Sequence, residues 1–116
     1  MRLFSIARIN PKILELWKKL VREIRRRRPE VILIRDPTIV WSGSEYIYHP
    51  DHRAAAMAAL DAPFPPAGQT NLFEELAQEG LTARKVRKVY ASVWENADVF
   101  INIEDTIDIK VVALRP

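Results

Sequence analysis

Residues 29–36 read Pro29-Glu30-Val31-Ile32-Leu33-Ile34-Arg35-Asp36, and this stretch determines the fold that we expect. Its centre is a short apolar run without polar alternation, which is typical of a strand buried on both faces in a parallel sheet. The residues before it predict a helix that Asn10 and Pro11 open and Pro29 ends. Apolar residues recur along this helix at three- and four-residue spacing and form one face: Ile13, Leu14, Trp17, Leu20, Val21 and Ile24. A helix followed by a buried strand is half of an α/β repeat.

The alternation continues downstream. We expect a loop over residues 35–48 with a turn at residues 42–44, and a second helix that begins near Pro50 and includes Leu60. The proline-rich residues 63–68 predict a surface excursion.

The remaining elements are expected to be shorter. Asn71 is expected to cap a short helix over residues 72–79, and Gly80 is expected to end it. Two β-rich stretches follow, over residues 86–94 and 99–103, with a turn at residues 95–98 between them. Asp105, with Asp108 three residues on, is expected to start a last helix that runs to residue 114. The pattern as a whole predicts an α/β fold.

Composition limits the kind of protein. The chain has 116 residues, the length of one domain, and 48% of them are hydrophobic, enough for a core. Because it contains no Cys, disulfides, thiolate metal sites and cysteine nucleophiles are excluded. Its apolar stretches are shorter than the roughly 18 residues of a membrane span, and residues 1–9 lack the features of a signal peptide. We therefore expect a cytoplasmic protein without a membrane partner.

The net charge is +3, and Arg25–Arg28 form a run of four cations. Such a run can bind phosphates, but no aromatic or glycine pattern accompanies it. Cations also favour the C-terminal end of a helix. We interpret the run as the solvated end of the first helix and do not expect a nucleic-acid partner.

The two histidines of the chain lie together in the segment Tyr48-His49-Pro50-Asp51-His52-Arg53. Pro50 places the segment at the start of a helix, so the three-residue spacing puts both imidazoles on one side of the first turn. The segment follows a loop from the C-terminal end of a buried strand, where open α/β sheets bind ligands. The helix dipole favours neutral imidazole, the form that binds metals, and Asp51 could fix the tautomer of one histidine.

Spacing alone leaves two interpretations open, namely metal or acid/base chemistry and a helix cap with two surface histidines. Two histidines do not complete a catalytic zinc site, which takes three protein ligands and a water. Asp36 could approach the site, although an Asp-Pro turn is the favoured interpretation. Tyr46 and Tyr48 could line a substrate pocket, and half-buried packing is the alternative. The three tryptophans are expected in the core or at an interface: Trp17, Trp41 and Trp94.

The segment from His49 to Ala55, His-Pro-Asp-His-Arg-Ala-Ala, resembles the second signature of the LmbE-like (PIG-L) N-deacetylases. Other stretches are similar to the family in the same order, and the resemblance extends over nearly the whole chain from about Pro11. These stretches are residues 27–31, 36–41, 46–48, 58–62, 79–81, 85–90 and 103–108.

The resemblance implies a Rossmann-like α/β domain with a mostly parallel sheet. It also implies a zinc-dependent hydrolase that cleaves an acetamide on an amino sugar or a similar small molecule, in which zinc polarises the amide carbonyl and delivers water. By position in the signature, His52 would bind the zinc. His49 would stabilise the oxyanion or protonate the leaving amine, oriented by Asp51. Arg53 would be a supporting or substrate-facing residue. Apart from the resemblance, Asp36 is a second candidate for a substrate-facing position.

The first signature of the family, Ala-His-Pro-Asp-Asp-Glu, has no counterpart in this chain, and residues 1–48 contain no His. In the family that signature supplies two zinc ligands and the general base. We therefore expect residues 1–116 to form a single partial domain, truncated on its N-terminal side. Two functions follow: a deacetylase whose site this chain does not complete, and a non-catalytic, self-associating binding module. Bare sheet edges and apolar surface would favour a homo-oligomer.

Overall fold

The computed structural model describes residues 11–93 and 95–116. The predictions for residues 1–10, including the cap at Asn10, and for Trp94 lie outside this part of the chain. The helices are α1 (Pro11–Arg27), α2 (Pro50–Asp61), α3 (Glu74–Gln78) and α4 (Ile107–Ala113), with 3₁₀ turns η2 (Pro66–Gly68) and η3 (Glu104–Thr106). The strands are β1 (Val31–Arg35), β2 (Trp41–Ser42), β3 (Tyr46–Ile47) and β4 (Lys88–Ser92).

Helix α1 carries the main core of the molecule. It ends at Arg27, two residues before Pro29, as the sequence predicts, and its buried residues Val21 and Ile24 lie in its C-terminal half. They pack with Ala62, Ala67 and Leu76 from the segments around η2 and α3. Ile13, in the N-terminal half of the predicted apolar face, is exposed. The core therefore lies at one end of the molecule, between α1, η2 and α3.

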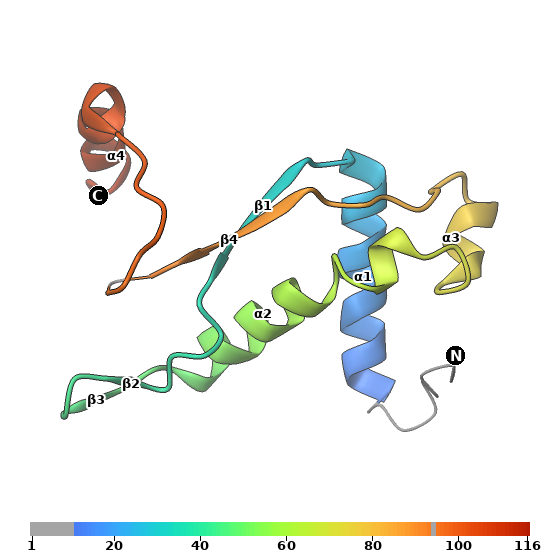
Figure 1. The fold of residues 1–116 in the computed structure, drawn as a ribbon, viewed down its shortest axis with the longest axis horizontal. Helices are drawn as coiled ribbons and strands as arrows, with labels where there is room; N and C mark the ends of the chain where they lie inside the picture. Colours follow the sequence, from blue (N-terminus) through green and yellow to red (C-terminus); the bar gives the residue numbers. More distant parts are fainter. Residues whose placement is uncertain (1–10, 94) are drawn as a thin grey trace.

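Strands β1 and β4 form a parallel pair, with Val31 opposite Lys88 and Arg35 opposite Ser92. Helix α2 lies between them in sequence and packs against β1 and α1. Figure 1 shows α1 and α2 on one side of the two strands. Parallel strands need a crossover connection, and the segment that contains α2 provides it here. The mixed α/β architecture with a small parallel sheet is thus confirmed.

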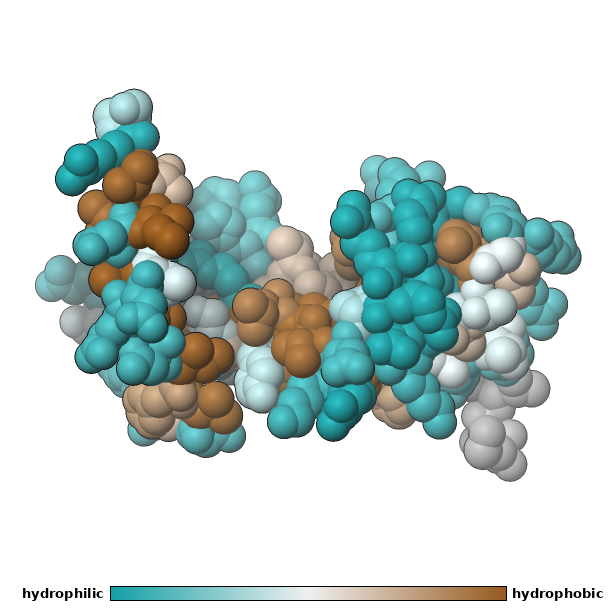
Figure 2. Space-filling view, turned by 90° about the horizontal axis from the view of Figure 1, so that it is seen from above, coloured by the Kyte–Doolittle hydropathy of each residue, from teal (hydrophilic) through white to brown (hydrophobic). Residues whose placement is uncertain are grey.

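The prediction that β1 is buried on both faces is wrong for the described chain. Ile34 is buried, but the neighbouring Leu33 is 74% exposed. Successive side chains of a strand point to opposite faces, and the described helices cover one face of the sheet. Figure 2 shows apolar residues gathered on this open side and on the C-terminal arm.

Residues 35–48 contain more order than the expected loop. Strands β2 and β3 pair antiparallel, with Trp41 opposite Ile47. The turn between them includes Gly43 at φ 64, a conformation that glycine adopts without steric cost. Trp41 is 64% exposed, so it is not a core residue, whereas Trp17 is half-buried.

The C-terminal third differs from the prediction at its element boundaries. Strand β4 is shorter than residues 86–94, and residues 99–103 form no strand, since no other described strand lies beside them to pair with. Asp105 lies within η3, and Thr106 precedes α4 without a side-chain cap. None of the described helices is long and apolar enough to cross a membrane.

Helix α3 begins at Glu74, preceded by Phe73 at φ 54 and not by a capping Asn71. Gly80, at φ 83, follows the helix as predicted.

The proline-rich residues 63–68 lie only partly at the surface: Phe64 is 81% exposed, as a surface excursion requires, but Pro66 and Ala67 are buried, so for them the prediction is wrong. Ala67 is fully buried, and η2 packs against α1. The side chain of Arg25, 2% exposed, extends into this segment. It donates hydrogen bonds of 2.7–3.3 Å to five backbone carbonyls, those of Pro66, Ala67, Gln69, Leu72 and Phe73.

The Arg25–Arg28 run is therefore not a uniformly solvated helix end. Buried carbonyls outside regular structure need donors, and Arg25 supplies them. Burial lowers the pKa of the Arg25 guanidinium, an effect that the charge of Glu75 partly opposes. Arginine nevertheless stays charged at neutral pH. Arg26 and Arg27 pair with Glu23 on the surface.

Candidate functional site

The N-terminus of α2 lies beside the C-terminal end of β1. Pro50 is the first residue of α2, and His49 immediately precedes it. Arg35, the last residue of β1, places a guanidinium nitrogen 3.0 Å from Nδ1 of His52. This contact joins the end of the strand to the first turn of the helix. The predicted placement of the two histidines is therefore confirmed.

The two imidazoles are neighbours, with ring centroids 5.6 Å apart. Nδ1 of His49 accepts a hydrogen bond of 3.2 Å from the backbone N–H of Asp51, so His49 caps α2. The Asp51 carboxylate lies 3.7 Å from the same nitrogen, beyond hydrogen-bond distance. The backbone of Asp51, and not its carboxylate, thus orients His49. Because Nδ1 accepts, the neutral ring carries its proton on Nε2.

Tyr48 forms the inner wall of this site. It is 8% exposed, and its ring makes an edge contact with His52 at a centroid distance of 6.1 Å. The Arg35 guanidinium lies 5.1 Å from the centroid of the same ring, a cation–π distance. Tyr46 contacts Tyr48 edge-on but is 57% exposed. Tyr48 therefore packs, while Tyr46 stands at the surface.

Arg53 is half-buried and donates to the backbone carbonyl of Tyr48. This bond ties the first turn of α2 to the segment that enters it. Part of the donor capacity of Arg53 is therefore used within the chain.

Asp36 forms the turn that the sequence favours. Its Oδ1 accepts hydrogen bonds from the backbone N–H of Thr38 at 2.8 Å and from the Thr38 hydroxyl at 2.6 Å. Asp36 also lines a cavity of 360 Å³ at the end of the sheet. The other lining residues are Ile39, Trp41, Ser42, Gly43, Val93, Glu95 and Asn96.

The described residues do not bring together a set of ligands for a metal ion. Within residues 11–93 and 95–116, no three His, Cys, Asp or Glu side chains come together to hold a metal ion. His52 has the donor chemistry of a zinc ligand, but its Nδ1 faces Arg35. A zinc ion at His52 would need further ligands from outside the described residues.

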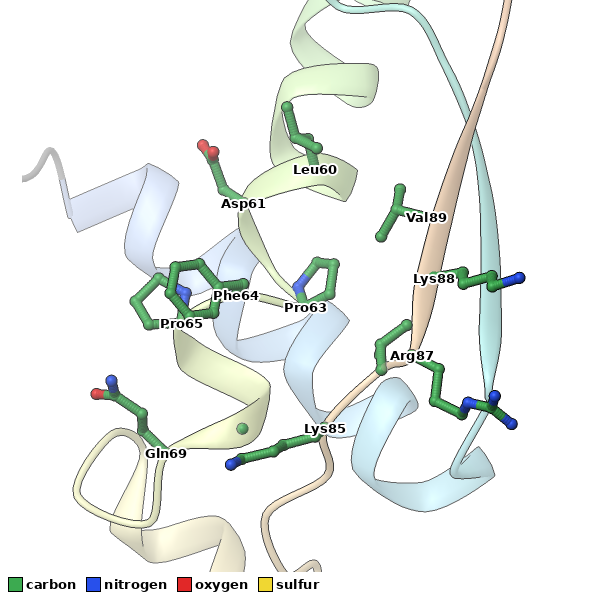
Figure 3. Close-up of a pocket in the computed structure, with 12 residues that line it drawn as sticks. Leu60, Asp61, Pro63, Phe64, Pro65, Gln69, Lys85, Arg87, Lys88 and Val89 are labelled. Atoms are coloured by element: carbon green, nitrogen blue, oxygen red, sulfur yellow. The ribbon is translucent and has the colours of Figure 1, made fainter. Parts of the chain in front are cut away.

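A larger cavity, of 810 Å³, lies at the opposite end of α2 (Figure 3). Leu60 and Asp61 line it from the helix, and Pro63, Val86 and Val89 add apolar surface. A 12-residue helix is about 18 Å long, so this cavity is separate from the histidine pair. Burial raises the pKa of the Asp61 carboxyl above its ordinary value.

Sequence reasoning identified the histidine pair but not Arg35. The signal that could have found it is its position at the carboxyl end of the strand, beside Asp36, where open α/β sheets place their ligand-binding residues.

Comparison with known proteins shows a similarity to a deacetylase. The chain is 30% identical over 105 residues to diacetylchitobiose deacetylase from Thermococcus kodakarensis. The alignment covers 90% of this chain but 37% of that protein, so the chain spans little more than a third of its relative's length. No protein-family model matches the chain.

The alignment includes the candidate site. It leaves out at most 11 of the 116 residues, so it contains residues 12–105 wherever it starts. Both histidines, Arg35 and Asp36 lie within that range. The similarity therefore supports a relationship to deacetylases, a class of hydrolases, through the part of the chain that carries the site.

Proposed function

We propose that the chain is part of a zinc-dependent N-deacetylase of the LmbE-like type, with a Rossmann-like layered fold and a cytoplasmic location. The substrate class is an acetamide on an amino sugar or a similar small molecule. The observation that carries the proposal is the similarity to a deacetylase over residues that include the His49–His52 segment. The position of this segment beside the end of β1 supports it, because open α/β sheets bind ligands there.

Each residue has a chemical role in this proposal. His52 would be the one zinc ligand that the described residues provide. When bound, the zinc would polarise the amide carbonyl and activate water. His49, with its proton on Nε2, can donate to an oxygen that gains charge or to a departing amine. Asp51 orients His49 through its backbone, and Arg53 and Asp36 remain candidates for substrate contact.

This proposal predicts that the 116-residue chain alone is inactive. A zinc site with three protein ligands is the catalytic norm, and the described residues supply one. General-base catalysis typically contributes roughly 10²–10⁴ in rate, and the family's base belongs to the signature that the chain lacks. We expect weak zinc retention after dialysis and no amine release from N-acetylated amino sugars above background. Stoichiometric zinc and turnover, both lost in His52→Ala, would show that groups from elsewhere complete the site.

A chimera tests the function directly. Residues 12–105 replace the matching segment of the Thermococcus kodakarensis deacetylase, and amine release from diacetylchitobiose is measured. We expect activity that His52→Ala and His49→Ala remove, whereas Arg87→Gln, an exposed change outside the site, leaves it intact. A folded chimera, judged by circular dichroism, without activity would contradict the proposal.

A second candidate function is a self-associating binding module on the same scaffold. The open face of the sheet and the apolar C-terminal arm favour it, since soluble monomers rarely expose large apolar patches. If the chimera is inactive and the isolated chain self-associates, the two results together would support this alternative.

A further inference from the structure

Arg35 makes two contacts at the candidate site. One guanidinium nitrogen lies 3.0 Å from Nδ1 of His52, and the guanidinium carbon lies 5.1 Å from the centroid of the Tyr48 ring. Tyr48 is buried, and its ring makes an edge contact with His52. Arg35, Tyr48 and His52 are therefore mutual neighbours.

The contact with Arg35 determines where the His52 proton resides. A guanidinium has five N–H donors and no acceptor, so Nδ1 must offer its lone pair. A neutral imidazole has one lone-pair nitrogen and one N–H. His52 therefore presents Nε2–H outward and has no free lone pair while Arg35 is in place.

We propose that Arg35 is a positioning residue that controls whether His52 can bind a metal ion. Binding through Nδ1 requires the guanidinium to leave that nitrogen. Binding through Nε2 places the ring proton on Nδ1, where it opposes the guanidinium N–H, so this route also breaks the contact. The positive charge of Arg35 adds repulsion toward a divalent cation. The role of Arg35 in zinc binding rests on the proposed function. Its effect on the tautomer of His52 does not.

The first experiment reads the tautomer without any metal. Two-bond ¹H–¹⁵N spectra of the imidazoles are recorded on the full chain at pH 8, where histidine is neutral. We expect the Nε2–H form of His52 to dominate in the wild-type chain and a mixture of tautomers in Arg35→Met. An Nδ1–H form in the wild-type chain, or an unchanged ratio in the variant, would overturn the proposal. Because the readout needs neither zinc nor substrate, it remains decisive if the deacetylase proposal fails.

The second experiment measures zinc affinity with a competing chelator dye. We expect Arg35→Met to bind zinc roughly tenfold more tightly than wild type, the scale of one hydrogen bond to a charged group. Arg35→Lys, which keeps a charged donor and serves as a milder change for folding, should gain less. The gain should disappear in Arg35→Met/His52→Ala.

The matched control is Arg87→Met, which removes an equal charge at an exposed position paired with Glu30 at 3.6 Å. It should leave zinc affinity unchanged. An equal gain in Arg87→Met would assign the effect to net charge and overturn the proposal. So would an Arg35→Met affinity no higher than that of wild type, including no binding by either chain.

Discussion

His49 and His52 are three residues apart, yet different partners hold their imidazoles. The backbone N–H of Asp51 donates to Nδ1 of His49, while the guanidinium of Arg35 approaches Nδ1 of His52. Both neutral rings therefore carry their protons on Nε2. His49 caps the helix and His52 does not, so substitutions can separate the capping role of His49 from the proposed chemistry.

At the residue scale, His49→Ala should destabilise the chain by about 1 kcal/mol, because α2 loses its side-chain cap. His49→Asn should restore most of the stability, since Asn is a preferred cap, but not the proton chemistry. His52→Ala should change stability little. Urea denaturation followed by circular dichroism measures all three, and equal losses for His49→Ala and His49→Asn would contradict the capping role.

The histidine pair could be predicted because the signal is local: His49-Pro50 starts a helix and fixes both rings on its first turn. Arg35 could not, because its partner lies 17 residues away and only the packing of α2 on β1 brings them together. Asp36 stands between these two cases, because only its local turn could be predicted. The Asp-Pro turn is a local preference, and the hydrogen bonds to Thr38 realise it.

At the scale of elements, Arg25 joins α1 to the irregular segment that follows α2. Its guanidinium reaches carbonyls 41–48 residues away. The carbonyls of Ala67 and Phe73 also accept from the backbone. Two surface ion pairs add to the connection between α1 and the α3 region, Lys18 with Glu75 at 2.6 Å and Arg22 with Glu79. Exposed pairs contribute little, so Arg25 carries most of this polar connection.

Arg25→Met should therefore destabilise the chain by about 3 kcal/mol, because buried carbonyls would lose their donor. Arg26→Met is the matched control, since Arg26 pairs with Glu23 on the surface of the same helix, and its effect should stay below about 0.5 kcal/mol. The urea concentrations at the unfolding midpoints of the two variants provide the measurement. Equal effects would show that Arg25 is not a core residue.

Asp61 ends α2, where a negative charge opposes the helix dipole, and burial raises the pKa of its carboxyl. The folded chain therefore holds this proton more tightly than the unfolded chain. The contribution of Asp61 to the free energy of unfolding therefore falls as pH rises from the unfolded pKa through the folded one.

Asp61→Asn should consequently stabilise the chain at pH 7, by about 0.5 kcal/mol from the dipole alone, and by less near pH 3. Asp98→Asn, at an exposed position, is the matched control. Thermal unfolding at both pH values provides the measurement. A loss of stability in Asp61→Asn at pH 7 would contradict the prediction.

Elements defined by local pattern were predictable, and elements defined by their neighbours were not. The apolar period of α1 and Pro29 mark that helix in any context. Residues 63–68 look like surface because of their prolines, but Arg25 donates to the carbonyls of Pro66 and Ala67 and allows these two residues to be buried. Residues 99–103 have strand-like composition, yet a strand requires a partner beside it.

At the scale of the whole molecule, the described chain is more extended than a closed domain. Its radius of gyration is 17.0 Å, against about 13 Å for a compact domain of this length. Figure 1 shows α4 at the end of an arm that stands apart from the helix–sheet layers. Large apolar side chains are exposed along the arm and on the open sheet face: Leu33, Phe100, Ile101, Ile109, Val112 and Leu114.

This exposed surface predicts that the isolated chain self-associates. Burial of apolar area contributes about 25 cal/mol per Å², and a standard interface buries about 1,600 Å² in total, enough to offset the cost of association. Light scattering coupled to size exclusion should give the mass of a dimer or larger oligomer at tens of micromolar. Leu33→Lys and Ile109→Lys should shift the mass toward monomer if the sheet face and the arm are the contact, while Thr70→Lys, at an exposed polar position, should not. A wild-type monomer at that concentration would refute self-association, and a mass that neither lysine substitution changes would place the contact elsewhere on the chain.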